Sequence, residues 1–518
     1  MAFRLKSSSV LLSNALWNII GTLSNIIILF FLYPFLIGRL GDSNYGFFLF
    51  LSTVTGIAGV ANLGLGEATL RYMAFYHGRE DTGGENRVLS SSFWMNCALG
   101  LVMTAGIILF SGGIMNIVKD SQIDPVAGVT MLKISAVTFL IRFTGGLFFS
   151  VPQAYQKYHY STLLTILEAL LRVAGYVGSI LYGYGLTGLV MTELILAGYY
   201  FIASYAVMKV LNNKLTIFKV PSKAGLSELF GYGFYAFLGQ LVGLLWQYTD
   251  RILLTVFLGT AALTYFVVPQ QLITKVFTLV TAAGAVLFPR FSSMTDREEI
   301  KKLFLVTTIL FLYLTIVAFA PMTIVIREFI SLWVSPEFAS RSAVVASILA
   351  ASYILRGGFI PYESLYRGLG KPKGIFVITL VSSIVIVATD AVLIPLIGLN
   401  GAGLAYVFSS LVGIGAFLYA WKKLLGQKDA AVLVRFLVIP LFGSYALLCA
   451  VYFAGSSLFA GLSWFGFIVY AAAVFLIFAG SLSLYLWRTS EFPVIKSTLQ
   501  SKILSFRKDE KKDQEFYP

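Results

Sequence analysis

Four basic residues lie deep inside stretches of sequence that are otherwise apolar. They are Arg142, Arg172, Lys275 and Arg356, and each falls near the middle of its stretch. An Arg guanidinium offers a planar fork of donors that fits a phosphate, and a Lys ammonium adds a point charge. Because Glu168 is the only acidic residue near the same level, the four cations together predict a binding site for an anion, above all a phosphate or pyrophosphate. For any one of them the alternative is a structural ion pair, such as Glu168 with Arg172 at i, i+4.

Other polar residues recur at helical spacing in the same stretches, which places them on one face of each predicted helix. Arg356, Glu363 and Arg367, for example, stand at i, i+7 and i+11. Polar residues inside a membrane are costly and usually face a cavity or another helix. We therefore expect a central water-filled cavity, with interhelical hydrogen bonding as the alternative for the asparagines. The other residues of these stripes are Asn14, Asn18, Asn25, Ser135, Thr138, Gln153, Thr165, Glu168, Tyr176, Gln240, Gln247, Arg251, Gln271 and Thr278.

An acid and a base are adjacent in the apolar segment QYTDRILLTVFLG, residues 247–259. Arg251 shares a face with two of the glutamines and is expected to point into the cavity. Adjacent side chains on a helix point about 100° apart, so Asp250 is expected to face a neighbouring helix. With Glu193 and Asp390, Asp250 maps toward the outer third of the membrane. We interpret Asp250 and Arg251 as an outer gate or lobe-fixing element, and Asp390 as a further gate or coupling candidate; the alternative assigns the pair to the pyrophosphate site.

The composition places the chain in a membrane. Of its residues 58% are hydrophobic and 12% charged, whereas soluble domains average about 45–50% and about 25%. The apolar runs are long enough to cross about 30 Å of hydrocarbon as helices and lack the alternation of barrel strands. The predicted fold is an all-α integral membrane protein with fourteen spans, at residues 12–37, 45–66, 89–118, 128–152, 161–182, 186–208, 229–258, 262–289, 303–333, 341–366, 374–397, 401–421, 432–455 and 462–487.

The net charge of +14 indicates orientation rather than nucleic-acid binding. If the N-terminus is cytoplasmic, Lys and Arg gather in the loops on that side, as in the loop that holds Lys209, Lys214 and Lys219. Both termini are then cytoplasmic, and the basic tail is expected to touch anionic membrane lipids. The first span has no small-residue cleavage site, so we interpret it as a retained helix. Cys97 and Cys449 both fall inside spans, which argues against a disulfide framework and a metal site.

The chain repeats itself in a unit of six spans. The segment from Gly185 aligns without gaps with the segment from Gly398, and the span ending FLIGRLG before Tyr45 resembles the one ending TVFLG before Tyr265. An even-numbered unit keeps its orientation, so the two lobes would be related by an axis along the membrane normal. The predicted organisation is an N-lobe (1–210), a C-lobe (225–425), two further helices (430–490) and a basic cytoplasmic tail (491–518).

These motifs resemble the polysaccharide-transporter, or O-antigen (Wzx-type) flippase, group of the multidrug/oligosaccharidyl-lipid/polysaccharide (MOP) exporter superfamily. The resemblance lies in FLIGRLGDSNYGFFLF, LGLGEATLRYMA and TDRILLTVFLGTAALTYF and extends over roughly residues 10–425. Two departures are that no glycine follows Tyr265 as Gly46 follows Tyr45, and that fourteen spans replace the usual twelve or so. The matched positions are Leu40, Gly41, Tyr45, Gly46, Leu63, Gly64, Leu65, Arg71, Asp250, Leu258, Gly259 and Tyr265.

The resemblance implies two six-helix bundles in a V around a cationic cavity in the inner (plasma) membrane. It implies transport, by alternating access, of a polyprenyl-pyrophosphate-linked oligosaccharide: an O-antigen, capsule or exopolysaccharide repeat unit. The expected partners are this substrate, membrane lipids, and the polysaccharide polymerase and chain-length machinery, with no nucleic acid. No cofactor is expected. Two driving forces stay open from the residues themselves: coupling to H⁺ or Na⁺ through Glu168, Asp250, Glu363 or Asp390, and downhill flipping driven by later polymerisation.

Four alternatives remain open. A cation-coupled multidrug exporter of the same superfamily would need acidic residues to dominate the midplane, and a peptidoglycan lipid-precursor flippase would carry an arginine-rich first span. A membrane-embedded glycan polymerase or ligase would need a long outer loop with catalytic residues, and the sequence has no loop beyond about 20 residues. A scaffolding protein would not need polar stripes. We therefore expect a transporter rather than an enzyme.

Overall fold

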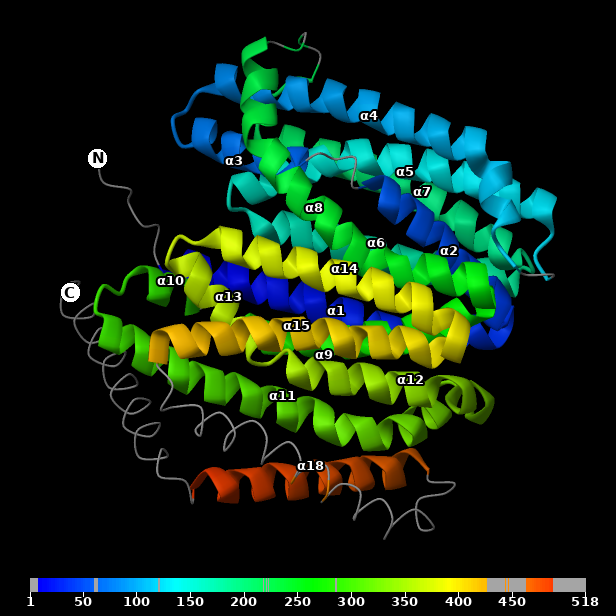
Figure 1. The fold of residues 1–518 in the computed structure, drawn as a ribbon. Helices are drawn as coiled ribbons and strands as arrows, with labels where there is room; N and C mark the ends of the chain where they lie inside the picture. Colours follow the sequence, from blue (N-terminus) through cyan, green and yellow to red (C-terminus); the bar gives the residue numbers. More distant parts are fainter. Residues whose placement is uncertain are drawn as a thin grey trace. The chain divides into compact units, whose positions relative to one another are not determined.

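The structure is a computed structural model that describes residues 8–425 and 463–487, with gaps at 60–63, 120–121, 218, 220, 222 and 285–286, and the isolated residues 443 and 446. Within this part the chain is helical and has no strand (Figure 1). Of the predicted elements, the span at 432–455 lies almost wholly outside the described residues, and the tail at 491–518 does so entirely. The side chains of Asn14, Asn18 and Asn25 are outside them too.

The contacts divide the chain into two compact units. Unit 1 comprises Met1–Val268 and Asp390–Ala402, and unit 2 comprises Pro269–Thr389 and Gly403–Pro518. This division differs from the proposed lobes, because it keeps residues 225–268 with the N-terminal part. The helices up to residue 258 are α1 (Ser8–Leu40), α2 (Asp42–Gly59), α3 (Leu65–His77), α4 (Thr82–Asn116), α5 (Pro125–Ala154), α6 (Tyr158–Leu181), α7 (Gly185–Leu211) and α8 (Lys223–Leu258).

In unit 1, α5 is the central helix, since it packs against α2, α3, α4, α6 and α7. Its start is fixed locally: the Asp124 carboxylate accepts a hydrogen bond from the Ala127 backbone N–H, and Pro125 occupies the first helical turn. An N-cap acid and a proline at this position both favour helix initiation. The polar stripe on α5 thus lies on a helix that has five neighbouring helices.

Unit 2 is built around one long helix. It comprises α10 (Leu287–Ser292), α11 (Arg297–Trp333), α12 (Pro336–Leu355), α13 (Phe359–Gly368) and α18 (Trp464–Trp487), and most of α9 (Thr260–Gly284), α14 (Pro372–Ile397) and α15 (Leu399–Leu425). The long helix α11 packs against α12, α13 and α18. Asp296 and Ser335 cap the starts of α11 and α12.

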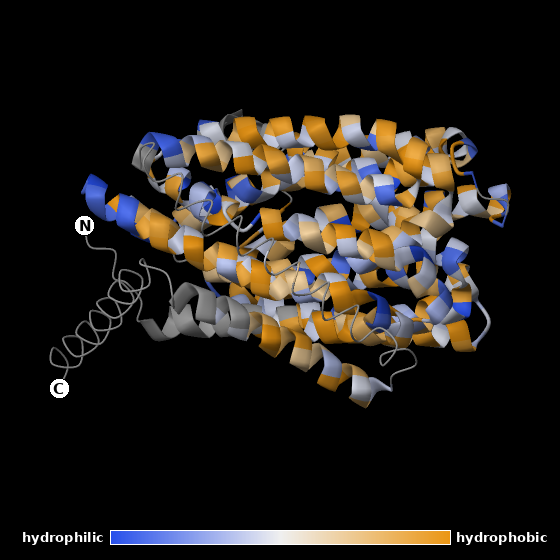
Figure 2. Ribbon diagram, turned by 60° about the horizontal axis from the view of Figure 1, so that its bottom comes forward, coloured by the Kyte–Doolittle hydropathy of each residue, from blue (hydrophilic) through white to orange (hydrophobic). Residues whose placement is uncertain are grey.

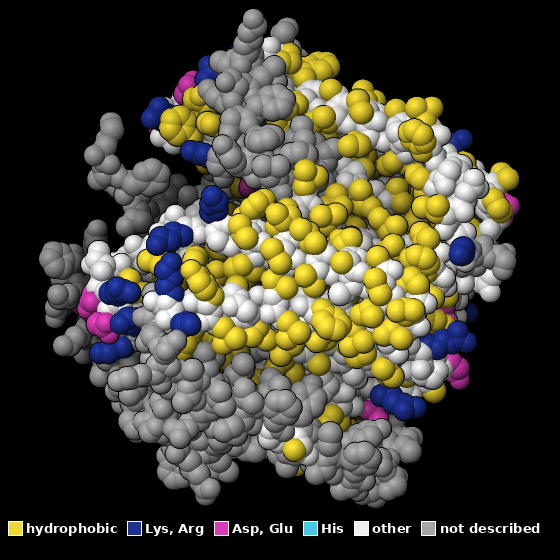
Figure 3. Space-filling view, viewed as in Figure 1, with side chains coloured by type: hydrophobic (Ala, Val, Ile, Leu, Met, Phe, Trp, Pro, Cys, Tyr) yellow, Lys and Arg dark blue, Asp and Glu magenta, His cyan; other side chains and the backbone are white. Residues whose placement is uncertain are grey.

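Ten of the described helices are long and apolar enough to cross a membrane, and the segments Ile26–Leu40 and Trp464–Gly480 are shorter apolar helices. Large hydrophobic side chains face outward: Leu109, Phe110, Ile195 and Ile202 are 69–79% exposed. Figure 2 shows apolar residues along the lengths of the helices, and Figure 3 shows Lys and Arg gathered toward helix ends with hydrophobic side chains between them. Such a surface is stable in lipid rather than water, which confirms the predicted all-α, multi-span membrane protein.

Two predicted spans are interrupted. The span at 45–66 covers parts of two helices, α2 and α3, and Gly64, directly before α3, has a left-handed backbone conformation (φ +71°). The span at 341–366 breaks after Leu355, where Arg356 caps α12. A Cβ on Gly357 would lie 2.1 Å from the Thr315 Oγ1 atom, so the chain bends where it packs closely on α11. The predicted stripe of Arg356, Glu363 and Arg367 is therefore wrong as a face of one continuous helix.

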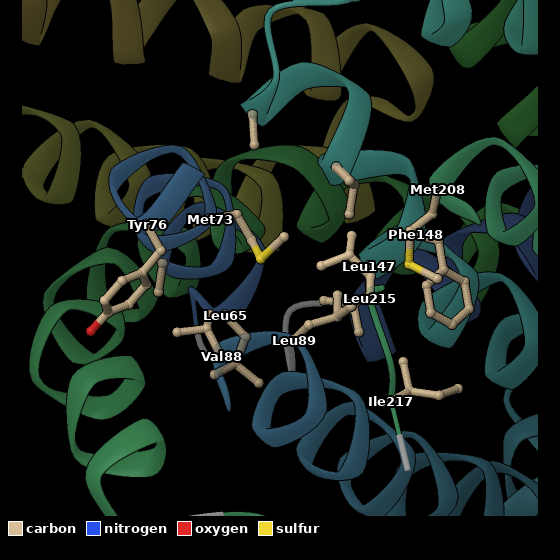
Figure 4. Packing of buried hydrophobic residues seen from close by; sticks show 13 residues of the cluster. Leu65, Met73, Tyr76, Val88, Leu89, Leu147, Phe148, Met208, Leu215 and Ile217 are labelled. Atoms are coloured by element: carbon tan, nitrogen blue, oxygen red, sulfur yellow. The ribbon is translucent and has the colours of Figure 1, made fainter. Parts of the chain in front are cut away.

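The end of unit 1 where α3 meets α4 is held by an apolar cluster (Figure 4). Met73, Val88, Leu89, Phe148 and Met208 are fully buried there. These side chains come from four helices, α3, α4, α5 and α7.

A polar network borders this cluster and is centred on Glu85, whose side chain is 3% exposed. Its carboxylate accepts hydrogen bonds from the Tyr155 hydroxyl at 2.6 Å and the Asn212 amide at 3.2 Å, and lies 3.2 Å from the His77 ring nitrogen. Burial and this carboxylate raise the pKa of Tyr155. No sequence pattern singles out these residues, because they meet only through the packing of α3, α4, α5 and α7.

Replacing Glu85 with Gln should lower the free energy of unfolding by about 2–3 kcal/mol, because the amide removes a charged acceptor from buried donors. The measurement is the thermal unfolding midpoint of the purified protein in detergent. Glu67→Gln, an exposed carboxylate on α3, is the matched control and should change stability by less than about 0.5 kcal/mol. Equal midpoints for the two variants would show that the network does not stabilise this end.

Candidate functional site

A cavity of about 420 Å³ opens inside unit 1. Helix α2 contributes one wall, α5 a second, and α6 and α7 the remainder. The lining residues with polar side chains are Ser52, Thr55, Ser135, Thr138, Arg142, Tyr176 and Glu193. The volume lies within the range of small-molecule binding sites, so the cavity can hold a charged group or a sugar.

The stripe predicted on α5 reaches this cavity. Ser135, Thr138 and Arg142 all line it. Thr138 donates its hydroxyl hydrogen to the Ile134 carbonyl at 2.9 Å, which satisfies the hydroxyl within the helix. Arg142 is therefore the charged donor that α5 presents to the cavity.

Arg142 belongs to a partly buried ring of four charges, which we call the charge ring: Arg142, Glu168, Arg172 and Glu193. The Arg142 Nη2 atom lies 2.6 Å from Glu168 Oε1 and 3.5 Å from Glu193 Oε2. The Arg172 Nη2 atom lies 2.6 Å from Glu168 Oε1, and its Nε atom lies 2.8 Å from Glu193 Oε1. Each arginine thus contacts both glutamates, and the ring has no net charge when all four groups are ionised.

Aromatic side chains surround the charge ring. The Tyr176 hydroxyl donates to Glu193 Oε1 at 2.5 Å, and the Arg142 guanidinium lies 5.4 Å from the centre of the Tyr200 ring. A cation over an aromatic face gains up to about 2 kcal/mol when desolvated. These neighbours hold the charged groups in place within an apolar bundle.

The expectation that Glu193 lies away from the mid-depth cations is wrong. Its carboxylate is within hydrogen-bonding distance of Arg172, so this part of the membrane interior is balanced rather than net positive. Position along one apolar stretch does not determine which charges meet, because long Arg and Glu side chains reach several ångströms along neighbouring helices. The alternative of a structural pair between Glu168 and Arg172 is realised, and the same glutamate also binds Arg142.

The other two predicted cations lie in unit 2. Lys275 on α9 is half-buried, and among the described residues it has no ion-pair partner. The Arg356 guanidinium lies 5.5 Å from the Phe277 ring centre and 5.4 Å from that of Tyr353. Gln271 is half-buried nearby in sequence on α9. Lys275 and Arg356 remain predicted contacts of the anion, and Gln271 remains a predicted lining residue of the cavity.

Glu363 and Arg367 form an i, i+4 ion pair on α13, with side chains 34% and 58% exposed. Exposed pairs of this kind contribute at most about 1 kcal/mol. Glu363 therefore has two candidate roles: the predicted one of lining the cavity, and a local structural one in this ion pair.

The gate or coupling candidates lie in unit 1. Asp250 is buried, and its carboxylate accepts a hydrogen bond from the Arg251 backbone N–H at 2.7 Å. The Arg251 guanidinium lies 5.6 Å from the centre of the Tyr248 ring. Gln240 is half-buried on the same helix and Gln247 is exposed.

Asp390 is fully buried, and within the described part of the chain neither of its carboxylate oxygens has a hydrogen-bond partner. Asp250 is a neighbouring charge that acts on it. A buried carboxylate without donors is costly to keep charged, so Asp390 is a candidate to bind a cation or proton. No group of three His, Cys, Asp or Glu side chains suited to a metal ion occurs among the described residues.

The repeated leucine-glycine motifs form two turns that contact each other. Gly41 joins α1 to α2 with φ +79°, and Gly259 joins α8 to α9 with φ +87°, a conformation that glycine adopts without strain. The Thr260 hydroxyl donates to the Ser43 carbonyl at 2.9 Å, and the Tyr265 hydroxyl donates to the Asp42 carboxylate. We call this contact of residues 41–46 with 259–265 the paired turns.

Comparison with known proteins supports both the fold and the family. A Shigella flexneri protein named as an O-antigen transporter is 21% identical over 424 residues, which cover 79% of this chain and 97% of that protein. The solved structure of the lipid II flippase MurJ in an inward closed conformation has a TM-score of 0.69 at 14% identity, covering 92% of this chain and 99% of that one. An inward-facing multidrug resistance MATE family transporter of the MOP superfamily has a TM-score of 0.61 at 15% identity, covering 80% and 96%. At these identities the structures establish a shared fold.

The family model described as polysaccharide biosynthesis protein matches residues 11–295, more than half of the 518 residues. The matched region contains the charge ring, its cavity and the paired turns. It also contains the motifs that carry the resemblance to polysaccharide transporters, which is thereby confirmed. The chain belongs to the polysaccharide biosynthesis protein family.

Proposed function

We propose that the protein is a flippase that moves a polyprenyl-pyrophosphate-linked oligosaccharide, such as an O-antigen, capsule or exopolysaccharide repeat unit, across the cytoplasmic membrane. The observation that carries the proposal is the cavity of unit 1, which is lined by Arg142 and Glu193 of the charge ring, with Arg142 as its cationic lining residue. Family membership and the name of the Shigella relative support the substrate class. The prenyl chain would stay in lipid while the cavity holds the head of the molecule.

The pyrophosphate is the part of the substrate that Arg142 would bind. A guanidinium can donate two parallel hydrogen bonds to phosphate oxygens, and the low dielectric constant of the surrounding helices strengthens their electrostatic attraction. Arg172, Lys275 and Arg356 remain proposed partners of the same anion. Hydroxyl and aromatic groups of the lining would contact the first sugar.

Alternating access requires one end of the path to close while the other opens. We assign the paired turns to the outer gate, since they hold two helix pairs together through side-chain and backbone hydrogen bonds. Asp250 and Arg251, about two turns earlier on α8, would support this gate.

Replacing Gly46 with Ala should open the paired turns. A Cβ at this position would lie 1.8 Å from the Thr260 carbonyl oxygen, which belongs to backbone. The expected cost is about 1–3 kcal/mol or more, measured as a lower thermal unfolding midpoint and reduced flipping. Gly38→Ala is the control, because nothing lies within 4 Å of its Cβ. The same effect in both variants would argue against the gate.

The driving force is proposed to be H⁺ or Na⁺, with Asp250 and Asp390 as binding candidates. Replacing Asp390 with Asn should remove the dependence of flipping on an imposed ion gradient while leaving the thermal unfolding midpoint unchanged or raised. The reason is that Asn keeps the shape of the side chain but removes the charge that a cation or proton would neutralise. Flipping that still follows the gradient in this variant would exclude Asp390 from coupling.

We further propose that the protein resides in the inner membrane with both termini in the cytoplasm, and that it acts as a transporter rather than an enzyme. A polysaccharide polymerase and chain-length machinery would then take the product at the outer face. Similarity of fold to MurJ favours a second candidate substrate, a peptidoglycan lipid precursor, which shares the polyprenyl pyrophosphate. The balanced charge ring gives no excess of acid for a cationic drug.

The test is a flipping assay with the full chain in proteoliposomes. Fluorescent polyprenyl-pyrophosphate oligosaccharide, a labelled peptidoglycan precursor and a cationic dye are compared in parallel. Protein-dependent flipping of the oligosaccharide substrate supports the proposal. Transport of the dye alone would contradict it, and flipping of the precursor alone would favour the second candidate.

A further inference from the structure

The four members of the charge ring are not equally available to a ligand. Arg142 and Glu193 line the cavity and are 34% and 22% exposed, whereas Glu168 is 8% exposed and does not line it. One of the two Arg142 contacts, that with Glu193, is long at 3.5 Å. Arg172 is 24% exposed and has close contacts to both glutamates, at 2.6 and 2.8 Å. An anion in the cavity would therefore separate Arg142, rather than Arg172, from the two glutamates.

Loss of Arg142 affects the two glutamates differently. Glu193 would keep the Arg172 Nε–H and the Tyr176 hydroxyl as donors. Glu168 would keep the Arg172 Nη2 atom and lose its 2.6 Å contact with Arg142. Because Glu168 is also the more buried of the two, it is the group whose negative charge becomes most costly.

We propose that a diphosphate bound by Arg142 is taken up together with one proton, which binds to Glu168. This inference rests on the proposed function, since it takes the substrate's diphosphate as the anion. The proton comes from water in the cavity, bonds to a carboxylate oxygen of Glu168, and returns to water when the anion leaves and Arg142 swings back. Because the proton neutralises the Glu168 carboxylate, the substrate-bound protein carries one negative charge fewer inside the membrane than it would without proton uptake.

The groups facing Glu168 do not supply another cation in place of Arg142. Helix α5 presents Arg142, α6 presents Arg172, and α7 presents Glu193 with the phenols of Tyr199 and Tyr200. Helix α1 also packs against α6; it contains no acid, and its one basic residue, Arg39, is exposed. The Tyr176 phenol is engaged with Glu193.

The experiment measures binding of a short-chain prenyl-diphospho-N-acetylglucosamine to the full chain in nanodiscs between about pH 5.5 and 8.5. This probe is a diester, so it lacks the phosphate ionisation near pH 6. Uptake of one proton means that the bound state carries more protons than the free state. The wild-type affinity should therefore weaken as pH rises, by up to tenfold per pH unit.

Glu168→Gln should bind the probe with an affinity independent of pH, whereas Glu193→Gln should retain the slope. Calorimetry of the wild type in two buffers of different ionisation enthalpy counts the protons directly and decides the matter even if Glu168→Gln does not fold. A flat wild-type profile with no proton uptake overturns the inference, as does a slope that survives in Glu168→Gln. Absence of binding at every pH would instead count against the proposed function.

Discussion

Replacing Arg142 with Gln is expected to slow substrate flipping by about 10- to 100-fold. This range corresponds to the loss of a charge-assisted hydrogen bond, about 1.5–3 kcal/mol. Arg142 is the charged donor that α5 brings to the cavity wall, and Gln keeps a polar side chain without the positive charge. The measurement is the initial rate of flipping of the labelled oligosaccharide lipid in proteoliposomes.

Two further substitutions sharpen this prediction. Arg142→Lys should recover part of the rate, because the charge is kept while the bidentate fork is lost. Lys133→Gln, an exposed cation on the same helix α5, should leave the rate within about twofold. A rate in Arg142→Gln equal to that of Lys133→Gln would remove Arg142 from the transport path.

Replacing Arg172 with Met should have the largest effect on stability, a loss of about 3–5 kcal/mol. Breaking a buried ion pair leaves an uncompensated charge, and here two carboxylates lose a close partner at once, Glu168 and Glu193. The measurement is the thermal unfolding midpoint in detergent together with the yield of folded protein.

The double variant Arg172→Met/Glu193→Gln should regain part of this loss, because one of the stranded charges is removed with its partner. Lys133→Met is the control and should lie within about 0.5 kcal/mol of the wild type. A midpoint for Arg172→Met that matches this control would show that the charge ring is not a structural element.

The membrane fold could be predicted from the sequence because lipid imposes one requirement on every span, a long apolar helix. The breaks within the spans could not be predicted from the sequence. The bend at Gly357 depends on the closeness of Thr315 on another helix, and glycines elsewhere in the chain sit inside unbroken helices. A single-sequence pattern does not distinguish these cases.

The sequence predicted which residues of α5 belong to the candidate site, but it did not predict that the charges of the site are balanced. Helical spacing placed Ser135, Thr138 and Arg142 on one face, and that face lines the cavity. Pairing across helices was missed, since the contact of Arg142 with Glu193 joins α5 to α7 and depends on how those helices pack. The sequence does contain an indication of this ion pair, since two oppositely charged residues lie in neighbouring spans. The depth of each residue along its own apolar stretch does not reveal the pairing.

The paired turns could be predicted in part. Repetition of the leucine-glycine motif before Tyr45 and Tyr265 is visible in the sequence, and both glycines adopt a left-handed conformation. What the repeat did not indicate is that its two copies contact each other through Asp42 and Thr260. A repeat predicts similar local structure, whereas contact between copies follows from tertiary packing.

The central claim, that Arg142 binds the pyrophosphate of a lipid-linked oligosaccharide, is tested most directly by determining the structure of the full chain with a prenyl-diphospho-sugar bound. We predict density for the diphosphate in the cavity of unit 1, with a phosphate oxygen about 2.7–2.9 Å from an Arg142 guanidinium nitrogen and the contact between Arg142 and Glu168 broken. Density for the diphosphate elsewhere, with the charge ring unchanged, would contradict the account.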